Sequence, residues 1–198
     1  MTLFLLIRHA MHDQLDRVLT GRRRGVPINA AGREQVRGLA KRLRPVGITH
    51  VQSSPCRRAL QTAAPIAWDA GLSVETFAAL DEVEFGDWSG RSFDELSREA
   101  GWRQWNEDRA RSQAPGGEDM ASVQDRIVAH LHRMHAQHPF GRIVIVSHAE
   151  TIRAAALHLM SMSLDDWSSV PVPPASITRV QVLAPGRALI GLEEPAAA

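Results

Sequence analysis

Two histidines and at least two arginines of the sequence follow apolar runs that have the length of buried strands. The runs, each with the polar residues after it, are Leu3–Ile7 with Arg8-His9, Ile48–Gln52 with Ser53-Ser54 and Arg57-Arg58, and Ile143–Val146 with Ser147-His148. In an open parallel sheet, ligands bind in the crevice beyond the carboxyl ends of the strands. We therefore expect these polar side chains to meet around one hollow at that edge of a sheet.

A hollow that holds imidazole and guanidinium groups is suited to phosphoryl transfer. Arginine grips phosphoryl oxygens with paired hydrogen bonds, and a neutral imidazole can attack phosphorus directly. Surrounding cations disfavour imidazolium, so they would keep His9 unprotonated at neutral pH. The departing oxygen needs a proton donor, and Glu82 is the candidate because its apolar neighbours would raise the carboxyl pKa. The adjacent carboxylates of Asp81 and Glu84 stay open as alternatives on the residues alone.

The same residues lie in motifs that resemble those of the histidine phosphatase superfamily, which includes the phosphoglycerate mutases and many small phosphatases. The matching segments are Leu6–His9, Thr20-Gly21, Pro27–Asn29 with Gly32, Ser53–Ala63, Leu80–Gly90, Gly116–Glu118 and Val144–His148. Each motif alone is common by chance, whereas their joint order and spacing cover most of the chain. The sequence is similar to the small phosphatase branch of that superfamily.

The resemblance implies roles for individual residues. It implies that His9 is the phosphorylated nucleophile and that Glu82 is the general acid and base. The implied phosphate ligands are Arg8, Arg58 and His148, and the implied substrate contacts are Thr20, Gly21 and Ala149. It implies no cofactor and no metal ion, as in a metal-independent phosphatase of the histidine acid phosphatase type.

This chain departs from the family pattern next to both histidines. Ala10 and Ala149 stand where the family usually has glycine, and Met11-His12 replaces the common Glu-Thr. Each alanine would add a methyl group close to the phosphate. None of the five central residues is changed, so we expect phosphoryl chemistry to persist. A phospho-ligand-binding module without turnover stays open as an alternative.

Length separates two activities within the family. The resemblance implies that mutases carry long insertions that keep a phosphorylated intermediate from water, whereas only residues 91–114 separate Gly90 from Pro115 here. We therefore expect a phosphomonoester hydrolase that acts through a phosphohistidine on a small phosphorylated metabolite, with mutase-type phosphoryl transfer as the alternative. Arg22–Arg24 and Arg91, Arg103 or Arg109 would favour a polyanionic substrate.

Helical patterns alternate with the apolar runs. They cover Ala31–Leu43, Pro55–Ala70 with proline in the first turn, Met120–Gln137 and Glu150–Met160. Strands that alternate with helices of this length predict a three-layer α/β/α sandwich with a mostly parallel central sheet. Ile177–Leu183 and Ala188–Leu192, around a turn at Pro185-Gly186, predict an antiparallel edge. We expect one domain over residues 1–198, with a small helical cover inserted at about 91–117.

The composition is that of an ordinary globular protein. The 198 residues are 44% hydrophobic and 23% charged with a net charge of +1, which gives no general attraction to nucleic acid or to an anionic membrane. The first apolar run is short, and no later run has the length of a membrane span. We expect a cytoplasmic protein whose partner is a small phosphorylated molecule, with a homodimer left open. The single Cys56 fits a reducing compartment.

Three further groups of residues allow a structural and a functional interpretation. A histidine series near the end of one predicted helix is interpreted as a solvent-facing stripe rather than a metal site: His130, His132, His135 and His138. Arg22–Arg24 is interpreted first as a solvated charge run and second as a site that steers the substrate. Three tryptophans could line a pocket or pack the inserted segment: Trp88, Trp102 and Trp105.

Overall fold

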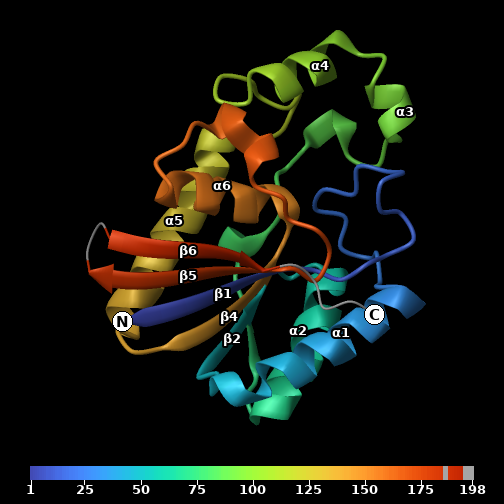
Figure 1. Cartoon of the computed structure of the whole chain (residues 1–198). Coiled ribbons are helices and arrows are strands. Elements are labelled where there is room, and N and C mark those ends of the chain that lie inside the picture. The colour runs from blue at the N-terminus through green and yellow to red at the C-terminus, as the bar shows by residue number, and fades with distance from the viewer. Residues whose placement is uncertain (185–186, 194–198) are drawn as a thin grey trace.

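A mixed β-sheet with helices on both faces forms the centre of the protein (Figure 1). The computed structural model describes residues 1–184 and 187–193. The strands within these residues are β1 (Thr2–Arg8), β2 (His50–Ser53), β3 (Val74–Thr76), β4 (Arg142–Ser147), β5 (Ile177–Ala184) and β6 (Arg187–Glu193). Their order is β3-β2-β4-β1-β5-β6, with the first four parallel and the last two antiparallel to their neighbours.

The helices complete a three-layer sandwich. The α-helices are α1 (Ala30–Leu43), α2 (Arg57–Ala70), α3 (Phe93–Leu96), α4 (Ala100–Glu107), α5 (Met120–Gln137) and α6 (Ala149–Leu159). Short 3₁₀ helices cover Arg44–Val46, Ala78–Leu80, Gly86–Trp88 and Leu164–Ser169. The expected fold class, with a mostly parallel sheet and an antiparallel edge, is confirmed. The predicted turn Pro185-Gly186 lies outside the described residues. Among the residues described, no helix is long and apolar enough to cross a membrane.

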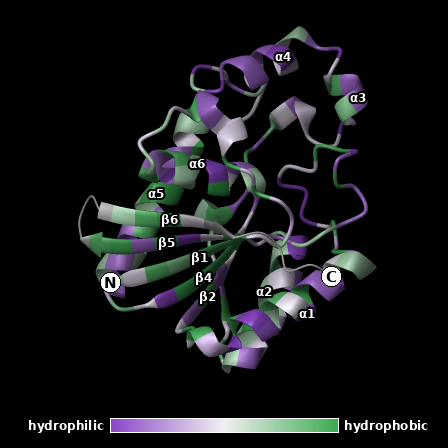
Figure 2. Ribbon diagram, in the orientation of Figure 1, coloured by the Kyte–Doolittle hydropathy of each residue, from purple (hydrophilic) through white to green (hydrophobic). Residues whose placement is uncertain are grey.

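Strand β1 supplies side chains to both hydrophobic cores. Successive side chains of a strand point to opposite faces. Phe4 and Leu6 therefore pack in the core that contains α5 and α6, whereas Leu5 and Ile7 pack in the core that contains α1 and α2. A strand covered on both faces is apolar throughout rather than alternating. In Figure 2 the central strands are largely green, while α4 in the cover is largely purple.

Two predicted boundaries were wrong, and one strand was missed. Helix α2 begins at Arg57 and not at Pro55, because the chain bends after β2 and the backbone N–H of Cys56 donates to the Ser54 hydroxyl. Strand β2 begins at His50 rather than Ile48. Strand β3 was not predicted. It has three residues, none of them fully buried, and so lacks the apolar run that marks a central strand.

The inserted segment forms the expected short helices over one end of the sheet, where α3 and α4 lie at the top of Figure 1. Aromatic rings hold it together. Trp88 meets Trp102 and Trp105 edge to face, with centroids 5.3 and 5.9 Å apart, an arrangement that adds about 0.5–1.5 kcal/mol per pair beyond area burial. That the chain forms one domain with this segment as its inserted cover stays a prediction.

Two glycines allow the cover to approach the residues that follow Glu82. Gly86 has a φ of 49°, and a Cβ there would lie 2.0 Å from the carbonyl oxygen of Pro115. A Cβ on Gly117 would lie 2.0 Å from the carbonyl oxygen of Glu84. Because no side chain fits in these positions, the Gly116–Glu118 motif is needed for packing between two backbone segments.

Candidate active site

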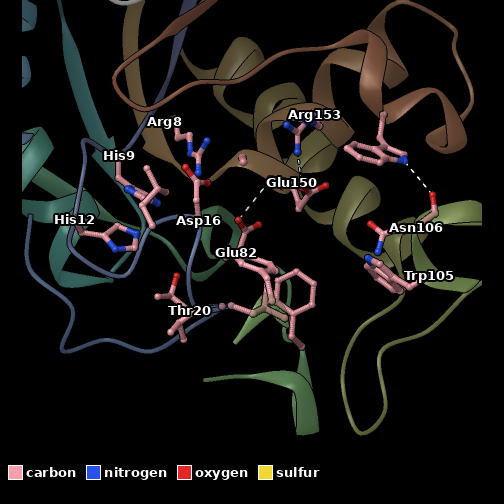
Figure 3. A pocket seen from close by; sticks show the side chains of 18 of the residues that line it. Arg8, His9, His12, Asp16, Thr20, Glu82, Trp105, Asn106, Glu150 and Arg153 are labelled. Atoms are coloured by element: carbon pink, nitrogen blue, oxygen red, sulfur yellow. Dashed lines mark hydrogen bonds and ion pairs between the residues drawn. The ribbon is translucent and has the colours of Figure 1, made fainter. Parts of the chain in front are cut away.

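A cavity of about 340 Å³ opens between the carboxyl end of β1 and the cover (Figure 3). Seven of the eight predicted site residues line it: Arg8, His9, Thr20, Gly21, Arg58, Glu82 and Ala149. The eighth, His148, lies directly behind this wall. The sequence therefore located one site from residues that are far apart along the chain.

His9 has the geometry of a neutral nucleophile. Its Nδ1 lies 2.9 Å from the carbonyl oxygen of Ala10, which can only accept, so Nδ1 carries the proton and Nε2 keeps its lone pair. Burial lowers the pKa of His9 well below its usual value, and Arg58 and Arg8 lower it further. The predicted effect of cations is present, but burial is the larger cause. The backbone N–H of His9 donates to Ser147, which fixes the end of β1 to β4.

Two arginines line this end of the cavity, and each has a guanidinium N–H group without a hydrogen-bond partner. Arg8 donates from Nη1 to the carbonyl of Val172 at 2.7 Å, and its Nε is buried without a hydrogen bond. Arg58 is 1% exposed and donates to the carbonyls of Gly21 and Arg23, while its Nε is likewise buried and unpartnered. A buried unsatisfied donor costs about 1–3 kcal/mol. Because both guanidinium groups also line the cavity, this wall is suited to an oxyanion.

His148 lies beside His9 but is not on the cavity wall. The ring centroids are 5.2 Å apart, as expected for two imidazoles at one site, yet His148 is fully buried. Its Nδ1 accepts from Arg58 at 3.0 Å, so Nε2 carries the proton and donates to Ser54 Oγ at 2.9 Å. Both nitrogens thus have partners within the protein. This arrangement gives His148 the role of holding Arg58, and its direct contact with phosphate stays a prediction.

A buried carboxylate ends this series of hydrogen bonds. Ser54 Oγ donates to Asp81 Oδ1 at 2.7 Å. Among the described residues, Cys56, Asp81 and His148 form the one group whose ligand atoms are close enough for a metal ion. The Ser54 hydroxyl already binds Asp81 and His148, so hydrogen bonding through one oxygen explains their spacing. Burial raises the pKa of the Cys56 thiol, which disfavours the thiolate that metals bind.

Of the three neighbouring carboxylates that the sequence offered, Glu82 is the one on the cavity wall. Asp81 is turned to Ser54, and Glu84 lies outside the lining. Burial raises the pKa of Glu82, and the nearby Glu150 raises it further. Its Oε1 accepts from the backbone N–H of Val83 at 3.0 Å. The raised pKa that apolar neighbours predicted is confirmed.

The backbone of Glu82 is clamped by arginines that the sequence did not connect to it. Arg22 and Arg126 both donate to the Glu82 carbonyl, at 2.8 and 3.1 Å. Both also pair with Glu118 of the Gly-Gly-Glu motif, at 2.8 and 3.3 Å. The interpretation of Arg22 as part of a solvated charge run was therefore wrong. Glu118 positions Glu82 through these two side chains.

Comparison with known proteins agrees with this geometry. A family model described as histidine phosphatase superfamily (branch 1) matches residues 4–194. The chain belongs to the histidine phosphatase superfamily. Phosphoserine phosphatase 1 of Hydrogenobacter thermophilus is 28% identical over 187 residues, covering 92% of this chain and 87% of that protein. The probable phosphoglycerate mutase GpmB of Salmonella paratyphi B is 34% identical over 144 residues, covering 72% and 66%. The solved structure of Bacillus stearothermophilus YhfR matches with a TM-score of 0.91 at 23% identity, covering 100% of this chain and 98% of that one.

The opposite wall of the cavity carries three charged side chains that the family motifs did not predict: Glu150, Arg109 and Arg153. Glu150 accepts from Arg109 of the cover and from Arg153 of α6, and Figure 3 shows Glu150 between Glu82 and Arg153. The Arg109 guanidinium lies 4.0 Å from the ring centroid of Trp167. Arg109 was one of three arginines suggested for a polyanionic substrate, whereas Arg91 and Arg103 do not line the cavity. A usable signal for Glu150 and Arg153 was their place within five residues after His148, in the first turns of α6.

Ala10 and Ala149, which stand where the family usually has glycine, lie in different surroundings. Ala149 lines the cavity, as expected. Ala10 is fully buried in the core with α1 and α2 and is absent from the lining, so the expectation that its methyl group lies close to the phosphate was wrong. The sequence could not show this because β1 ends just before Ala10, and the direction of the following loop is not encoded in strand periodicity.

The histidine series and the tryptophans also have clear outcomes. His130 is fully buried, with Nε2 at 2.8 Å from Gln52, so the interpretation of that residue as solvent-facing was wrong. His132 is exposed. Trp102 and Trp105 both pack the cover and line the cavity, which joins the two alternatives left open for them.

Proposed function

We propose that this member of the superfamily is a metal-independent phosphomonoesterase that transfers the phosphoryl group of a small metabolite to His9 and then to water. The observation that carries the proposal is the position of His9, with its Nε2 lone pair free, on the same cavity wall as the guanidinium groups of Arg8 and Arg58. A phosphoryl group bound there would lie between the nucleophile and two positive charges. The kinship with a phosphoserine phosphatase supports a small phosphorylated substrate.

Each side chain has one task in the first step. His9 Nε2 attacks phosphorus while Arg8 and Arg58 neutralise charge on the three equatorial oxygens. The bond between phosphorus and the ester oxygen breaks as Glu82 protonates that oxygen, and the alcohol leaves. The raised pKa of Glu82 favours the protonated carboxyl that this step needs.

The second step reverses the proton transfer. Ionised Glu82 takes a proton from water, the water oxygen attacks the phosphoryl group, and the bond to His9 breaks. Orthophosphate leaves and Glu82 is protonated again. Glu82 thus serves as acid and then as base, a role for which a pKa between the usual carboxyl value and neutrality is suitable.

Hydrolysis of p-nitrophenyl phosphate in the presence and absence of a chelator tests this proposal. We expect turnover that the chelator does not change, an acid-stopped intermediate labelled on His9, and loss of both in His9→Ala. Tight orthophosphate binding without turnover would instead support a binding module. Activity that requires a bisphosphorylated primer and moves phosphate between positions of phosphoglycerate would support a mutase.

A further inference from the structure

His12 is a third imidazole at the phosphoryl end of the cavity that no family motif assigns. Its ring centroid lies 5.2 Å from that of His9, and the two labelled rings lie next to each other in Figure 3. The side chain is 3% exposed and lines the cavity, whereas His148, at the same centroid distance from His9, does not. Among the described residues, His12 is therefore the imidazole besides His9 that lines the cavity.

The hydrogen bonding of His12 is incomplete. Its Nδ1 is buried and has no hydrogen-bond partner. The other nitrogen, Nε2, also has no partner within the described residues but is not among the buried unpartnered atoms, so it is the nitrogen open to the cavity. With no acceptor beside Nδ1, the proton of the neutral ring belongs on Nε2, where water or substrate can accept it. Burial, followed by Arg58 and Arg8, lowers the pKa of His12 to about 4, which keeps the ring neutral at pH 7.

The phosphoryl oxygens would have too few hydrogen-bond donors without His12. Arg58 uses three of its five N–H groups on Gly21, Arg23 and His148. His148 has both nitrogens in hydrogen bonds inside the protein. The three equatorial oxygens of a transferring phosphoryl group offer more acceptor sites than Arg8 and the remainder of Arg58 fill. The N–H of a neutral imidazole adds a donor without adding a further positive charge beside His9.

The geometry points to His12 as a further catalytic residue, which donates a hydrogen bond from Nε2–H to an oxygen of the phosphoryl group carried by His9. This inference rests on the proposed function for the phosphoryl group. Because the charge on those oxygens changes during transfer, the contact strengthens in the transition state. His12 thus takes part in the chemical step and not in recognition of the leaving group.

Three substitutions separate this role from simple packing. His12→Phe keeps a planar ring without a donor. The amide nitrogen of His12→Gln can reach the place of Nε2, and that of His12→Asn reaches only the place of Nδ1. For p-nitrophenyl phosphate we expect His12→Phe to lower kcat/KM about 10- to 100-fold, mostly through kcat, since hydrogen bonds to charged groups contribute about 1.5–3 kcal/mol. His12→Gln should be at least about fivefold faster than His12→Phe and His12→Asn.

Binding provides a readout that does not need turnover. In the wild-type protein, orthophosphate or vanadate should shift the nitrogen and proton resonances of the His12 Nε2–H group, which are assigned by their loss in His12→Gln. The inhibition constant for vanadate should rise in His12→Phe by about the factor lost in kcat/KM. Equal activity of His12→Phe and the wild type, or equal loss in His12→Gln and His12→Phe, would overturn the inference, as would an Nε2–H signal that ignores both anions.

The two proposals fail in different ways. One outcome is that neither the wild-type protein nor His9→Ala hydrolyses p-nitrophenyl phosphate, while orthophosphate still shifts the His12 signal. In that case the phosphatase proposal is wrong and the contact between His12 and phosphate stands. If hydrolysis depends on His9 but is indifferent to His12, the phosphatase proposal stands and the role of His12 is wrong. Thermal unfolding of each variant identifies any loss that comes from misfolding.

Discussion

Removal of the Ser54 hydroxyl would break the connection between the buried carboxylate of Asp81 and the arginine that faces the phosphoryl group. In Ser54→Ala, the Nε2–H of His148 loses its acceptor, and Asp81 loses a 2.7 Å hydrogen bond, although both side chains are at most 3% exposed. A buried neutral donor without a partner costs about 1–3 kcal/mol, and a hydrogen bond to a charged group contributes about 1.5–3 kcal/mol. The sum is about 4 kcal/mol, a large part of the 5–15 kcal/mol that folded domains have.

Urea denaturation of wild type, Ser54→Ala and Asp81→Asn measures this coupling. Asp81→Asn keeps an oxygen that accepts from Ser54, so it should lose less free energy of unfolding than Ser54→Ala. We also expect kcat for p-nitrophenyl phosphate to fall in Ser54→Ala, because His148 then turns to another partner and no longer holds Arg58 in place. A free energy of unfolding for Ser54→Ala within about 0.5 kcal/mol of the wild-type value would refute the assigned hydrogen bonds.

Two further predictions concern pH. Glu150→Gln removes a negative charge that raises the pKa of Glu82, so the high-pH limb of the kcat profile should move to lower pH; an unmoved limb would contradict that assignment. His130 has a folded-state pKa of about 4 against 6.5, so between these values the unfolded chain binds more protons, and stability present above pH 6.5 is lost as the pH falls toward 4. From pH 7 to pH 5 this amounts to about 2 kcal/mol, and urea midpoints should show that His130→Gln, which keeps a donor for Gln52, reduces the loss by that amount.

The sheet could be predicted because its central strands are buried on both faces. Leu3–Ile7 and Ile143–Val146 are continuous apolar runs of strand length, and the structure contains both within β1 and β4. Strand β3 has no such run, since it lies at the edge with two exposed residues of three. The Leu164–Ser169 segment that brings Trp167 to the cavity was also missed. Such short elements are determined by tertiary packing rather than by local periodicity.

The site was predictable where a residue is fixed by its strand end and unpredictable where a hydrogen bond decides its direction. Arg8 and His9 lie where the end of β1 must place them. His148 follows β4 in the same way, yet Arg58 and Ser54 turn its nitrogens away from the cavity. His12 carried no periodic signal because it lies in a loop. Its sequence signals were a polar ring three residues after the proposed nucleophile and the departure from the family's common Glu-Thr at Met11-His12.

The charges on the cavity wall connect the raised pKa of Glu82 with the dianionic substrate that we propose. Among the described residues that line the cavity, the guanidinium groups are those of Arg8, Arg58, Arg109 and Arg153, and the carboxyl groups are those of Asp16, Glu82 and Glu150. With Glu82 protonated, four positive and two negative charges remain, and the excess of two equals the charge of a phosphomonoester dianion. In the proposed reaction, ionisation of Glu82 before the substrate arrives would add a negative charge and reduce that excess. Since Glu150 disfavours that ionisation and Arg109 of the cover binds Glu150, we expect the position of the cover to influence the pKa of Glu82.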